Sequence, residues 1–250
     1  YPLAVNNPPN PLHGGVMGFS HRNWSATPLT RADGAPSLRL EYHSPNGEEG
    51  YPGNVDAAVT YTFTKRHELI LEIEAVTDQS TPFSLTQHAY FNLQGEGSGS
   101  IEDHRLQILA ETYAPTDDHM GLLGRRAPVT APGNDFNQTQ RIGDALPHLH
   151  KHFLPPRSGL TQVARVEEPI SGRVLNVRTD EPCLQFYTGV SLDDSMIGKS
   201  GQPYAPYAGL CLEAEGYPDG PNSPALGDIL LRPGQTYRRT TVYAFSTLPN

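Results

Sequence analysis

The sequence predicts an all-β protein. Several segments alternate between apolar and polar residues with a period of two, the pattern of a strand with one buried face. Glycine and proline number 24 each among the 250 residues and occur along the whole chain, which suits many short strands joined by turns. No stretch shows the periodicity of a convincing amphipathic helix. With 36% hydrophobic residues the chain can bury a sizeable core, and we expect one domain over residues 1–250.

The strands are predicted in chain order from this alternation. In the first, 38–42, apolar residues alternate with Arg39 and Glu41, and in the second, 55–63, they alternate with Asp56 and two threonines. Similar patterns predict further strands at 68–76, 106–110, 174–178, 184–188 and 237–245. Turn-forming sequences separate them, including Pro45-Asn46-Gly47, Ser171-Gly172 and Pro233-Gly234.

Charge and hydropathy exclude several classes of partner. The net charge of -9 leaves no basic stripe to neutralise phosphates, which argues against nucleic acid. No stretch approaches the roughly 20 apolar residues of a membrane helix, and residues 1–10 do not form a basic-then-apolar export signal. We therefore expect a soluble cytoplasmic protein, a monomer or homodimer, that acts on a small molecule and binds neither nucleic acid nor a membrane.

Residues 84–92, Ser-Leu-Thr-Gln-His-Ala-Tyr-Phe-Asn, combine strand-like alternation with side chains that can do chemistry. If they form a strand, one face is mostly apolar and the other carries Thr86, His88, Tyr90 and Asn92. Together these side chains make a hydrogen-bonding wall suited to a polyol. The alternative is a solvated strand face, or a histidine with a structural role only.

Glu213 ends the apolar run Gly209-Leu210-Cys211-Leu212, just before a polar loop. A carboxylate at such a boundary is desolvated on one side, which tends to raise its pKa toward a value useful for a general base. The alternative is that Glu213 only marks the point where the strand reaches the surface.

His13 and Gln185 are further candidates to contact a ligand. The glycines after His13 let the backbone turn tightly and bring the imidazole toward a ligand, although a turn histidine can equally be structural. In the strand at 184–188, Gln185 and Tyr187 share a face with Cys183, and Gln185 offers both a donor and an acceptor to a hydroxyl.

Taken together, these motifs resemble those of the galactose mutarotase, or aldose 1-epimerase, family. They occur in the family's order and span nearly the whole chain, so the set is far more specific than any single motif. The matching segments are Asn6-Asn7, Leu12-His13-Gly14-Gly15 with Gly18-Phe19 and Trp24, Gly47-Glu48-Glu49-Gly50-Tyr51-Pro52-Gly53, His88-Ala89-Tyr90-Phe91-Asn92-Leu93, Gln185-Phe186-Tyr187-Thr188-Gly189, and Leu212-Glu213 with Pro218-Asp219 and Asn222.

The resemblance implies an antiparallel β-sandwich with a shallow sugar cleft across one sheet, and neither a metal nor an organic cofactor. It also implies that His88 is the proton donor to the ring oxygen of a sugar and that Glu213 is the proton acceptor from the anomeric hydroxyl. By the same resemblance, the residues that hold the sugar are His13, Tyr90 and Gln185. These residue types suit ring opening, which needs one group that accepts a proton and one that donates it, with the roles reversed when the ring closes.

The sequence departs from the family's pattern at two places. Family members carry an Asn-Arg pair upstream of the Asn6-Asn7 segment, and this chain starts too late to contain it, so we expect some N-terminal strands to be missing. The opening residues 1–5 already have the composition of a strand. A substrate-binding Asp of the family aligns with His150. This replacement leaves the preferred sugar open, but it does not affect the assignment of the acid and the base. His150 is therefore a further substrate-binding candidate.

The histidines around His150 raise the question of a metal. On a strand, His148, His150 and His152 would face the same way, and three imidazoles could bind zinc with Asp144 as a fourth ligand. Prolines on both sides argue against a regular strand, so we expect a histidine-rich polar loop without a metal.

The 2 cysteines, Cys183 and Cys211, are too few for a disulfide framework and lack the spacing of metal ligands. Each stands two residues before a candidate site residue, Gln185 or Glu213, and should share its sheet face. We expect buried, reduced thiols that lie near each other and pack without forming a disulfide.

The leading interpretation is an isomerase that interconverts the anomers of free aldohexoses such as galactose and glucose. A mutarotase for a phosphorylated hexose is the second, but no Arg/Lys cluster accompanies the site motifs, as a phosphate would favour. The third comes from another class: a catalytically silent carbohydrate-binding or sugar-sensing module. The presence of His88 and Glu213 counts against this third interpretation, whereas His150 and the missing upstream segment count for it.

Overall fold

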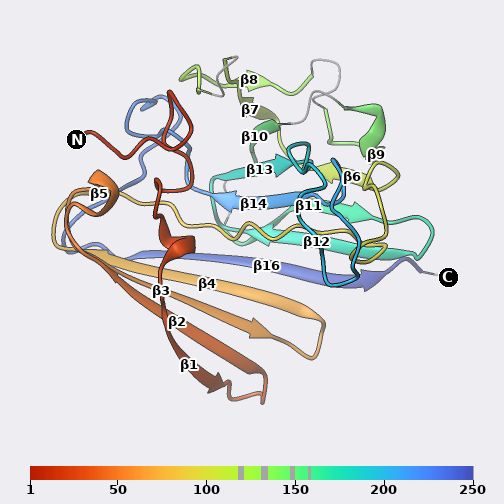
Figure 1. The fold of residues 1–250 in the computed structure, drawn as a ribbon, viewed down its shortest axis with the longest axis horizontal. Helices are drawn as coiled ribbons and strands as arrows, with labels where there is room; N and C mark the ends of the chain where they lie inside the picture. The colour runs from red at the N-terminus through yellow and green to blue at the C-terminus, as the bar shows by residue number, and fades with distance from the viewer. Residues whose placement is uncertain (118–120, 131–134, 147–149, 157–158, 250) are drawn as a thin grey trace. The chain divides into compact units, whose positions relative to one another are not determined.

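The structure is a computed structural model that describes residues 1–117, 121–130, 135–146, 150–156 and 159–249. It confirms the all-β prediction, because strands in antiparallel ladders make up most of the regular structure (Figure 1). The chain divides into two compact units, which are described separately. The first unit comprises residues 1–85, 116–124 and 216–240, and the second comprises 86–115, 125–215 and 241–250. A single domain over residues 1–250 stays a prediction.

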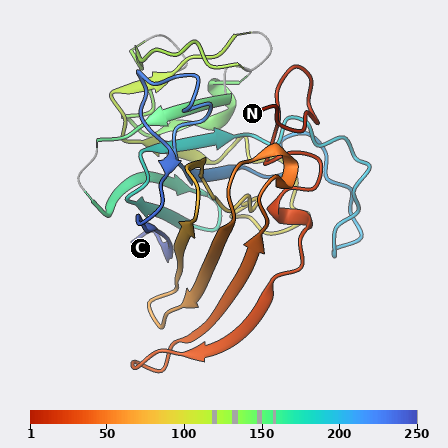
Figure 2. The same cartoon turned by 90° about the vertical axis from the view of Figure 1, so that its left-hand side faces the viewer.

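The first unit contains an antiparallel sheet in which consecutive strands are neighbours, seen as the long red-to-orange arrows of Figure 2. Its strands are β1 (Ser25–Thr30), β2 (Pro36–Ser44), β3 (Val55–Phe63) and β4 (Glu68–Thr77). A short ladder joins β5 (Thr81–Pro82) to β15 (Leu230–Leu231). Two 3-10 turns, η1 (Phe19–His21) and η2 (Glu48–Gly50), precede β1 and β3.

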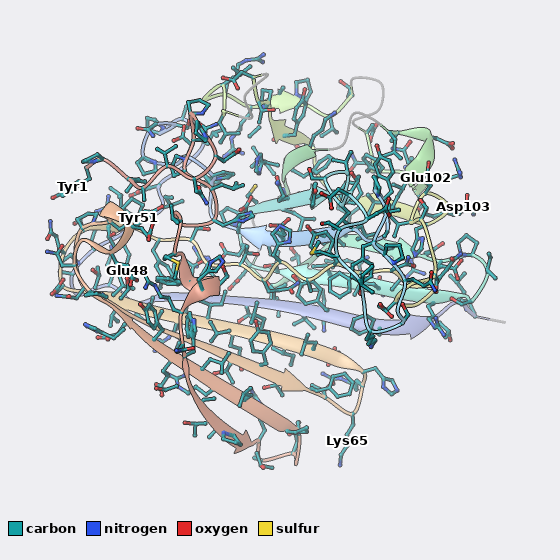
Figure 3. All side chains as sticks on the ribbon, viewed as in Figure 1. Tyr1, Glu48, Tyr51, Lys65, Glu102 and Asp103 are labelled. Carbon is teal, nitrogen blue, oxygen red and sulfur yellow. The ribbon has the colours of Figure 1, made fainter. Side chains whose placement is uncertain are left out.

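The core of the first unit follows directly from the alternation in the sequence. On β3 the side chains that turn inward are Val55, Ala57 and Val59, and β4 adds Leu71, Ile73 and Ala75. Glu48, labelled in Figure 3, fixes the turn beside this sheet, because its carboxylate accepts hydrogen bonds from Tyr42 (2.7 Å) and Ser44 (2.6 Å) and pairs with Arg22 at 3.0 Å.

The second unit contains two antiparallel ladders. One runs in the order β16-β12-β11-β6-β9, with residues 241–247 of β16 (Tyr237–Thr247), β12 (Arg173–Thr179), β11 (Thr161–Glu167), β6 (Arg105–Ile108) and β9 (Gln140–Arg141). The other runs β14-β13-β10-β7-β8, with β14 (Cys211–Glu215), β13 (Cys183–Tyr187), β10 (His150–Leu154), β7 (Thr112–Ala114) and β8 (Ala127–Pro128). A 3-10 turn, η3 (Ile142–Asp144), follows β9.

Apolar side chains fill the space between these two ladders. The ring of Phe136 contacts Phe153 of β10 and Phe186 of β13 edge-on, with centroids 6.0 and 6.1 Å apart. The Tyr243 hydroxyl of β16 donates a hydrogen bond of 2.9 Å to the carbonyl of Leu212 on β14. Because side chains alternate along a strand, this inward face leaves the polar residues of β13 and β14 on the opposite face.

The strands predicted at 38–42, 55–63, 68–76, 106–110, 174–178, 184–188 and 237–245 are all present, with small differences at their ends. The strand predicted at 106–110 is β6, which ends at Ile108, and the strand predicted at 184–188 is β13, which begins at Cys183. The strand prediction is wrong for residues 1–5, which belong to no ladder, and for 84–92, where the isolated bridge of Phe91 to Leu210 is the pairing found. Alternation indicates that one side of a segment is buried. The segment joins a ladder only where a neighbouring strand has free backbone groups to pair with it.

Among the described residues, the helical segments are single 3-10 turns, and none has the length and apolar character needed to cross a bilayer. The cytoplasmic location and the oligomeric state stay predictions.

Glu168, in the turn between β11 and β12, gives a testable contribution to stability. Its side chain is fully buried and accepts hydrogen bonds from the backbone of Ile170 (2.8 Å) and Ser171 (2.5 Å). Burial alone opposes ionisation, but the hydrogen bonds from Ser171, Ile170 and Gln94 outweigh it and lower the pKa of Glu168 from 4.5 to about 2. We expect Glu168→Ala to reduce the free energy of unfolding by roughly 2–4 kcal/mol at neutral pH, because the backbone N–H groups of Ile170 and Ser171 lose their charged acceptor.

The stability lost in Glu168→Ala should become smaller as the pH falls. Since the pKa of Glu168 is lower in the folded state, its contribution is complete above the unfolded value of 4.5 and disappears as the pH falls toward about 2. Urea unfolding of both proteins between pH 7 and pH 3 measures it, and the gap between them should narrow in acid. Glu167→Ala is the matched control, since Glu167 is partly exposed and paired with Arg165 at 2.7 Å, a kind of pair worth about 1 kcal/mol or less. Equal losses of unfolding free energy in Glu168→Ala and Glu167→Ala would contradict the stabilising role of the buried Glu168 carboxylate.

Candidate functional site

The outward face of β13 and β14 carries the polar residues that the sequence singled out. Gln185 of β13 stands opposite Glu213 of β14 in the ladder, and Tyr187 stands opposite Cys211. The alternate residues Leu184 and Leu212 turn into the core and are fully buried. The same-face placement predicted within each strand is therefore confirmed, and the register adds the pairing across strands.

His88 reaches this face from the extended segment before Leu93. Backbone hydrogen bonds between Phe91 and Leu210, of 2.7 and 2.9 Å, hold that segment beside the start of β14. The two ring nitrogens of His88 then face different partners: Nε2 lies 3.6 Å from Oε1 of Glu213, and Nδ1 lies 3.4 Å from Sγ of Cys211. The acid and base implied by the resemblance are thus direct neighbours.

Glu213 is almost entirely enclosed, with 5% of its surface exposed. Burial first, and the nearby Glu215 carboxylate second, raise the pKa of Glu213 from 4.5 to about 8. Among the described residues, Oε1 of Glu213 and Oε1 of Gln185 are buried acceptors without a hydrogen-bond partner. Buried acceptors of this kind are costly, and a ligand that brings hydroxyl donors would satisfy both.

Two tyrosines flank the pair. The rings of Tyr90 and Tyr187 lie 5.3 and 6.1 Å from the ring of His88, centroid to centroid, and 6.0 Å from each other. Burial, together with Cys211 and Tyr187, raises the pKa of the Tyr90 phenol, so Tyr90 stays neutral. Tyr90 is still 46% exposed, which leaves its ring available to a ligand.

His13 belongs to the first unit, where the predicted tight turn is confirmed. Its φ is 54°, and the following Gly14 and Gly15 have φ of 83° and 103°. A side chain at Gly15 would collide with Glu49, whose carboxylate accepts a hydrogen bond of 2.8 Å from the backbone of Val16. The role of His13 in holding a sugar stays a prediction.

The histidine-rich segment corrects one expectation. Residues from His150 to Leu154 form strand β10 and pair with β13, although the neighbouring prolines argued against a strand. Proline interrupts a ladder only within it, and Pro155 stands just past the last residue of β10. The backbone of His150 lies opposite Tyr187, and its substrate-binding role stays a prediction. His148 lies outside the described residues, and Asp144 pairs with Arg141 at 3.1 Å.

The two cysteines are both free and buried, as expected, but they are not neighbours. In the ladder Cys183 stands opposite Glu215, and Cys211 stands opposite Tyr187. They are therefore four residues apart along the strands, roughly 13 Å at about 3.3 Å per residue. Sharing a face with a site residue did not bring them together, because the register of β13 against β14 offsets them.

The sequence placed Cys183 on this face beside Gln185, but it did not connect His152 or Glu215 to it. His152 of β10 pairs with Glu215 of β14 at 3.0 Å, and Sγ of Cys183 lies 3.9 Å from the same oxygen of Glu215. In the sequence, Glu215 stands two residues from Glu213 and Cys183 stands two residues from Gln185, so each pair shares a strand face. The pairing of β10 with β13, which brings His152 to that face, comes only from the structure.

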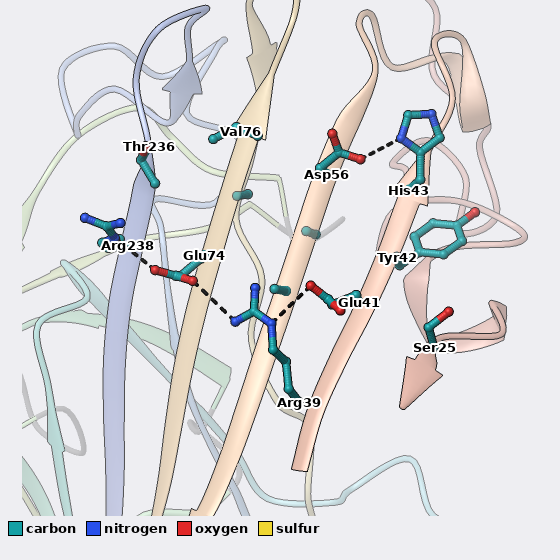
Figure 4. Close-up of a pocket in the computed structure, with 13 residues that line it drawn as sticks. Ser25, Arg39, Glu41, Tyr42, His43, Asp56, Glu74, Val76, Thr236 and Arg238 are labelled. Carbon is teal, nitrogen blue, oxygen red and sulfur yellow. Dashed lines mark hydrogen bonds and ion pairs between the residues drawn. The ribbon is translucent and has the colours of Figure 1, made fainter. Parts of the chain in front are cut away.

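A hollow of about 610 Å³ on the sheet of the first unit is a different feature (Figure 4). Its charged side chains are already paired, because Arg39 contacts Glu41 and Glu74 at 3.1 and 3.4 Å, and Arg238 also contacts Glu74 at 3.0 Å. None of the site residues predicted from the sequence lines it, so the candidate site is the face of β13 and β14.

The fold and the relatives of this sequence define an isomerase of the mutarotase class. The chain belongs to the aldose 1-epimerase family, whose model matches residues 1–244. It is 41% identical to a galactose mutarotase of Rattus norvegicus over 98% of this chain and 72% of the relative. It is 34% identical to an aldose 1-epimerase of Escherichia coli over 97% of this chain and 72% of that protein.

Solved structures agree. An aldose epimerase homologue from C. elegans superimposes with a TM-score of 0.88 at 29% identity, covering 98% of this chain and 74% of that chain. A galactose 1-epimerase from Lactobacillus acidophilus gives a TM-score of 0.83 at 27% identity, covering 98% of this chain and 72% of that chain. The family resemblance and the mutarotase-like fold are therefore confirmed.

Proposed function

We propose that the protein interconverts the α and β anomers of free aldohexoses, with galactose and glucose as substrates. In this proposal His88 is the acid, Glu213 is the base, and Gln185 and Tyr90 hold the sugar. The observation that carries it is the buried Oε1 of Glu213, which has no hydrogen-bond partner in the described part of the chain and lies 3.6 Å from Nε2 of His88. Relatives named galactose mutarotase and aldose 1-epimerase give the reaction its class.

The reaction needs one proton distributed over the pair. Glu213 takes the proton of the anomeric hydroxyl while the C1–O5 bond breaks and His88 protonates O5, which leaves an open-chain aldehyde. Rotation about C1–C2 presents the other face of the aldehyde to the O5 hydroxyl. The ring then closes as His88 takes back the O5 proton and Glu213 returns a proton to O1.

The surroundings of Glu213 suit this task. The pKa of Glu213, raised to about 8, makes it a stronger base than an exposed glutamate. A sugar hydroxyl that donates to Oε1 stabilises the ionised form and lowers that pKa on binding. Oε1 of Glu213 therefore gains a hydrogen-bond donor when a sugar binds.

Cys211 helps to orient the acid. Burial and the Glu213 carboxylate raise the pKa of the Cys211 thiol, so it remains an S–H group beside Nδ1 of His88. When Nδ1 carries a proton it donates weakly to the Cys211 sulfur, which leaves Nε2, the nitrogen that faces Glu213, to exchange the proton with the sugar.

Polarimetry on freshly dissolved α-galactose and α-glucose tests the proposal. We expect the approach to anomeric equilibrium to be faster than in buffer alone, in proportion to protein concentration. Binding of either sugar by calorimetry without any acceleration would instead identify a silent carbohydrate-binding module. Acceleration confined to glucose 6-phosphate would identify a mutarotase for a phosphorylated hexose.

A further inference from the structure

Three different metal-ligating side chains meet on strands β10, β13 and β14 of the second unit. They are His152, Cys183 and Glu215, and their ligand atoms all lie within 4.8 Å of one another. Cys183 and Glu215 are direct partners in the ladder, and His152 of the neighbouring strand pairs with Gln185, two residues along β13 from Cys183. The site proposed for sugar chemistry does not use these side chains.

The distances fit a small ion with tetrahedral coordination. Nδ1 of His152 lies 3.0 Å from Oε1 of Glu215, and Sγ of Cys183 lies 3.9 Å from the same oxygen. Zinc bonds of about 2.0–2.1 Å to nitrogen and oxygen and about 2.3 Å to sulfur place tetrahedral ligand atoms about 3.3–3.6 Å apart. The observed separations bracket that range, so rotamer adjustments of a few tenths of an ångström would complete the geometry.

A second group of similar composition, His88, Cys211 and Glu213, also has its ligand atoms within 4.8 Å of one another, but its closest contacts are arranged differently. There, Nδ1 of His88 faces the thiol while Nε2 faces the carboxylate, so the two partners lie off different sides of the imidazole ring. One ion can bind only one nitrogen of a ring. At His152 the closest contacts share one carboxylate oxygen, and the ring presents the single nitrogen Nδ1 to it.

The surroundings favour a cation and leave it a way in. Besides Glu215, the buried Glu181 carboxylate acts electrostatically on Cys183, where its negative charge favours a cation and the charge of Arg126 opposes one. The side chains of His152 and Glu215 are 15% and 17% exposed, so the group is open on one side while the thiol is enclosed.

We propose that His152, Cys183 and Glu215 form a binding site for Zn²⁺ or a similar borderline-soft divalent ion. The ion takes Nδ1 of His152, Sγ of Cys183 as the thiolate and a carboxylate oxygen of Glu215, with water in the fourth position. The thiol proton passes to solvent as the metal–sulfur bond forms. This site carries no step of the proposed sugar chemistry.

Cobalt titration of the whole protein in a Cys211→Ser background tests the proposal, because any thiolate-to-cobalt charge-transfer band must then come from Cys183. We expect such a band with one equivalent of Co²⁺ and its displacement by Zn²⁺. In the Cys211→Ser background, a second substitution, Glu215→Gln or His152→Gln, should weaken cobalt binding by at least about tenfold. Removal of even an outer hydrogen-bonding partner of a metal ligand can weaken metal binding by this much. Glu167→Gln is the matched control and should leave the titration unchanged.

Circular dichroism and a thermal melt of each variant establish that it is folded, which matters for changes beside a fully buried cysteine. The proposal is overturned by absence of the thiolate band in the folded Cys211→Ser protein. A band that survives both Glu215→Gln and His152→Gln unchanged also overturns it. Wild-type protein that shows the band while Cys211→Ser does not would place the ion at the other group instead.

Discussion

Replacing Glu213 by glutamine should lower the mutarotase rate constant by about 10³-fold, within the roughly 10²–10⁴-fold range of general acid–base catalysis. The amide keeps the size of the side chain and an acceptor oxygen, but it cannot take the proton of the anomeric hydroxyl. Progress curves followed by polarimetry over a range of galactose concentrations measure the change. The loss should fall on kcat, with sugar affinity changed far less, because the deleted proton transfer occurs only in the reaction.

The fold should tolerate this change. Glu213 is 5% exposed and its Oε1 has no hydrogen-bond partner among the described residues, so a neutral amide removes the cost of burying a charge. We expect the melting temperature of Glu213→Gln to equal or exceed that of the wild type. Residues that serve function often reduce stability, so their replacement can raise it. Glu41→Gln is the control, since Glu41 is an exposed partner of Arg39 in the first unit. A Glu213→Gln protein with the wild-type rate would exclude Glu213 as the base.

Replacing His88 by asparagine should have the next largest effect, a fall in kcat of about 10²-fold or more. Asparagine can still hydrogen-bond to the ring oxygen, but it cannot carry a proton to it. The same polarimetric assay applies, and imidazole added to the buffer should restore part of the rate. Such rescue separates loss of an acid from a packing defect, because dissolved imidazole can carry a proton in place of His88 but cannot reposition a displaced segment.

His43→Asn serves as the control for His88→Asn. His43 is exposed on β2 and paired with Asp56 at 2.7 Å, within the first unit. If His88→Asn kept the wild-type rate, the acid would have to be another group. The side chain of Tyr90, whose ring centroid lies 5.3 Å from that of His88, would then be the next to change.

Much of this fold can be predicted from the sequence because burial repeats along a strand. The alternation at 55–63 and 68–76 predicted β3 and β4 closely, and their inward residues are the observed core. Alternation alone failed at 84–92, where the segment is extended but has one bridge, from Phe91 to Leu210, as its ladder contact. A period of two describes which sides face the core and says nothing about whether a neighbouring strand is present.

The sequence by itself determined the class of the fold, the family, and the residues that share a face within each strand, such as Cys211 with Glu213. These are local properties, set by side-chain periodicity and by motif order. Only the tertiary structure decided which residues meet across strands: His88 with Glu213 and Cys211, and His152 with Glu215 and Cys183. Register and strand order depend on the packing of the whole ladder, and a shift of one residue would turn each of these side chains to the other face.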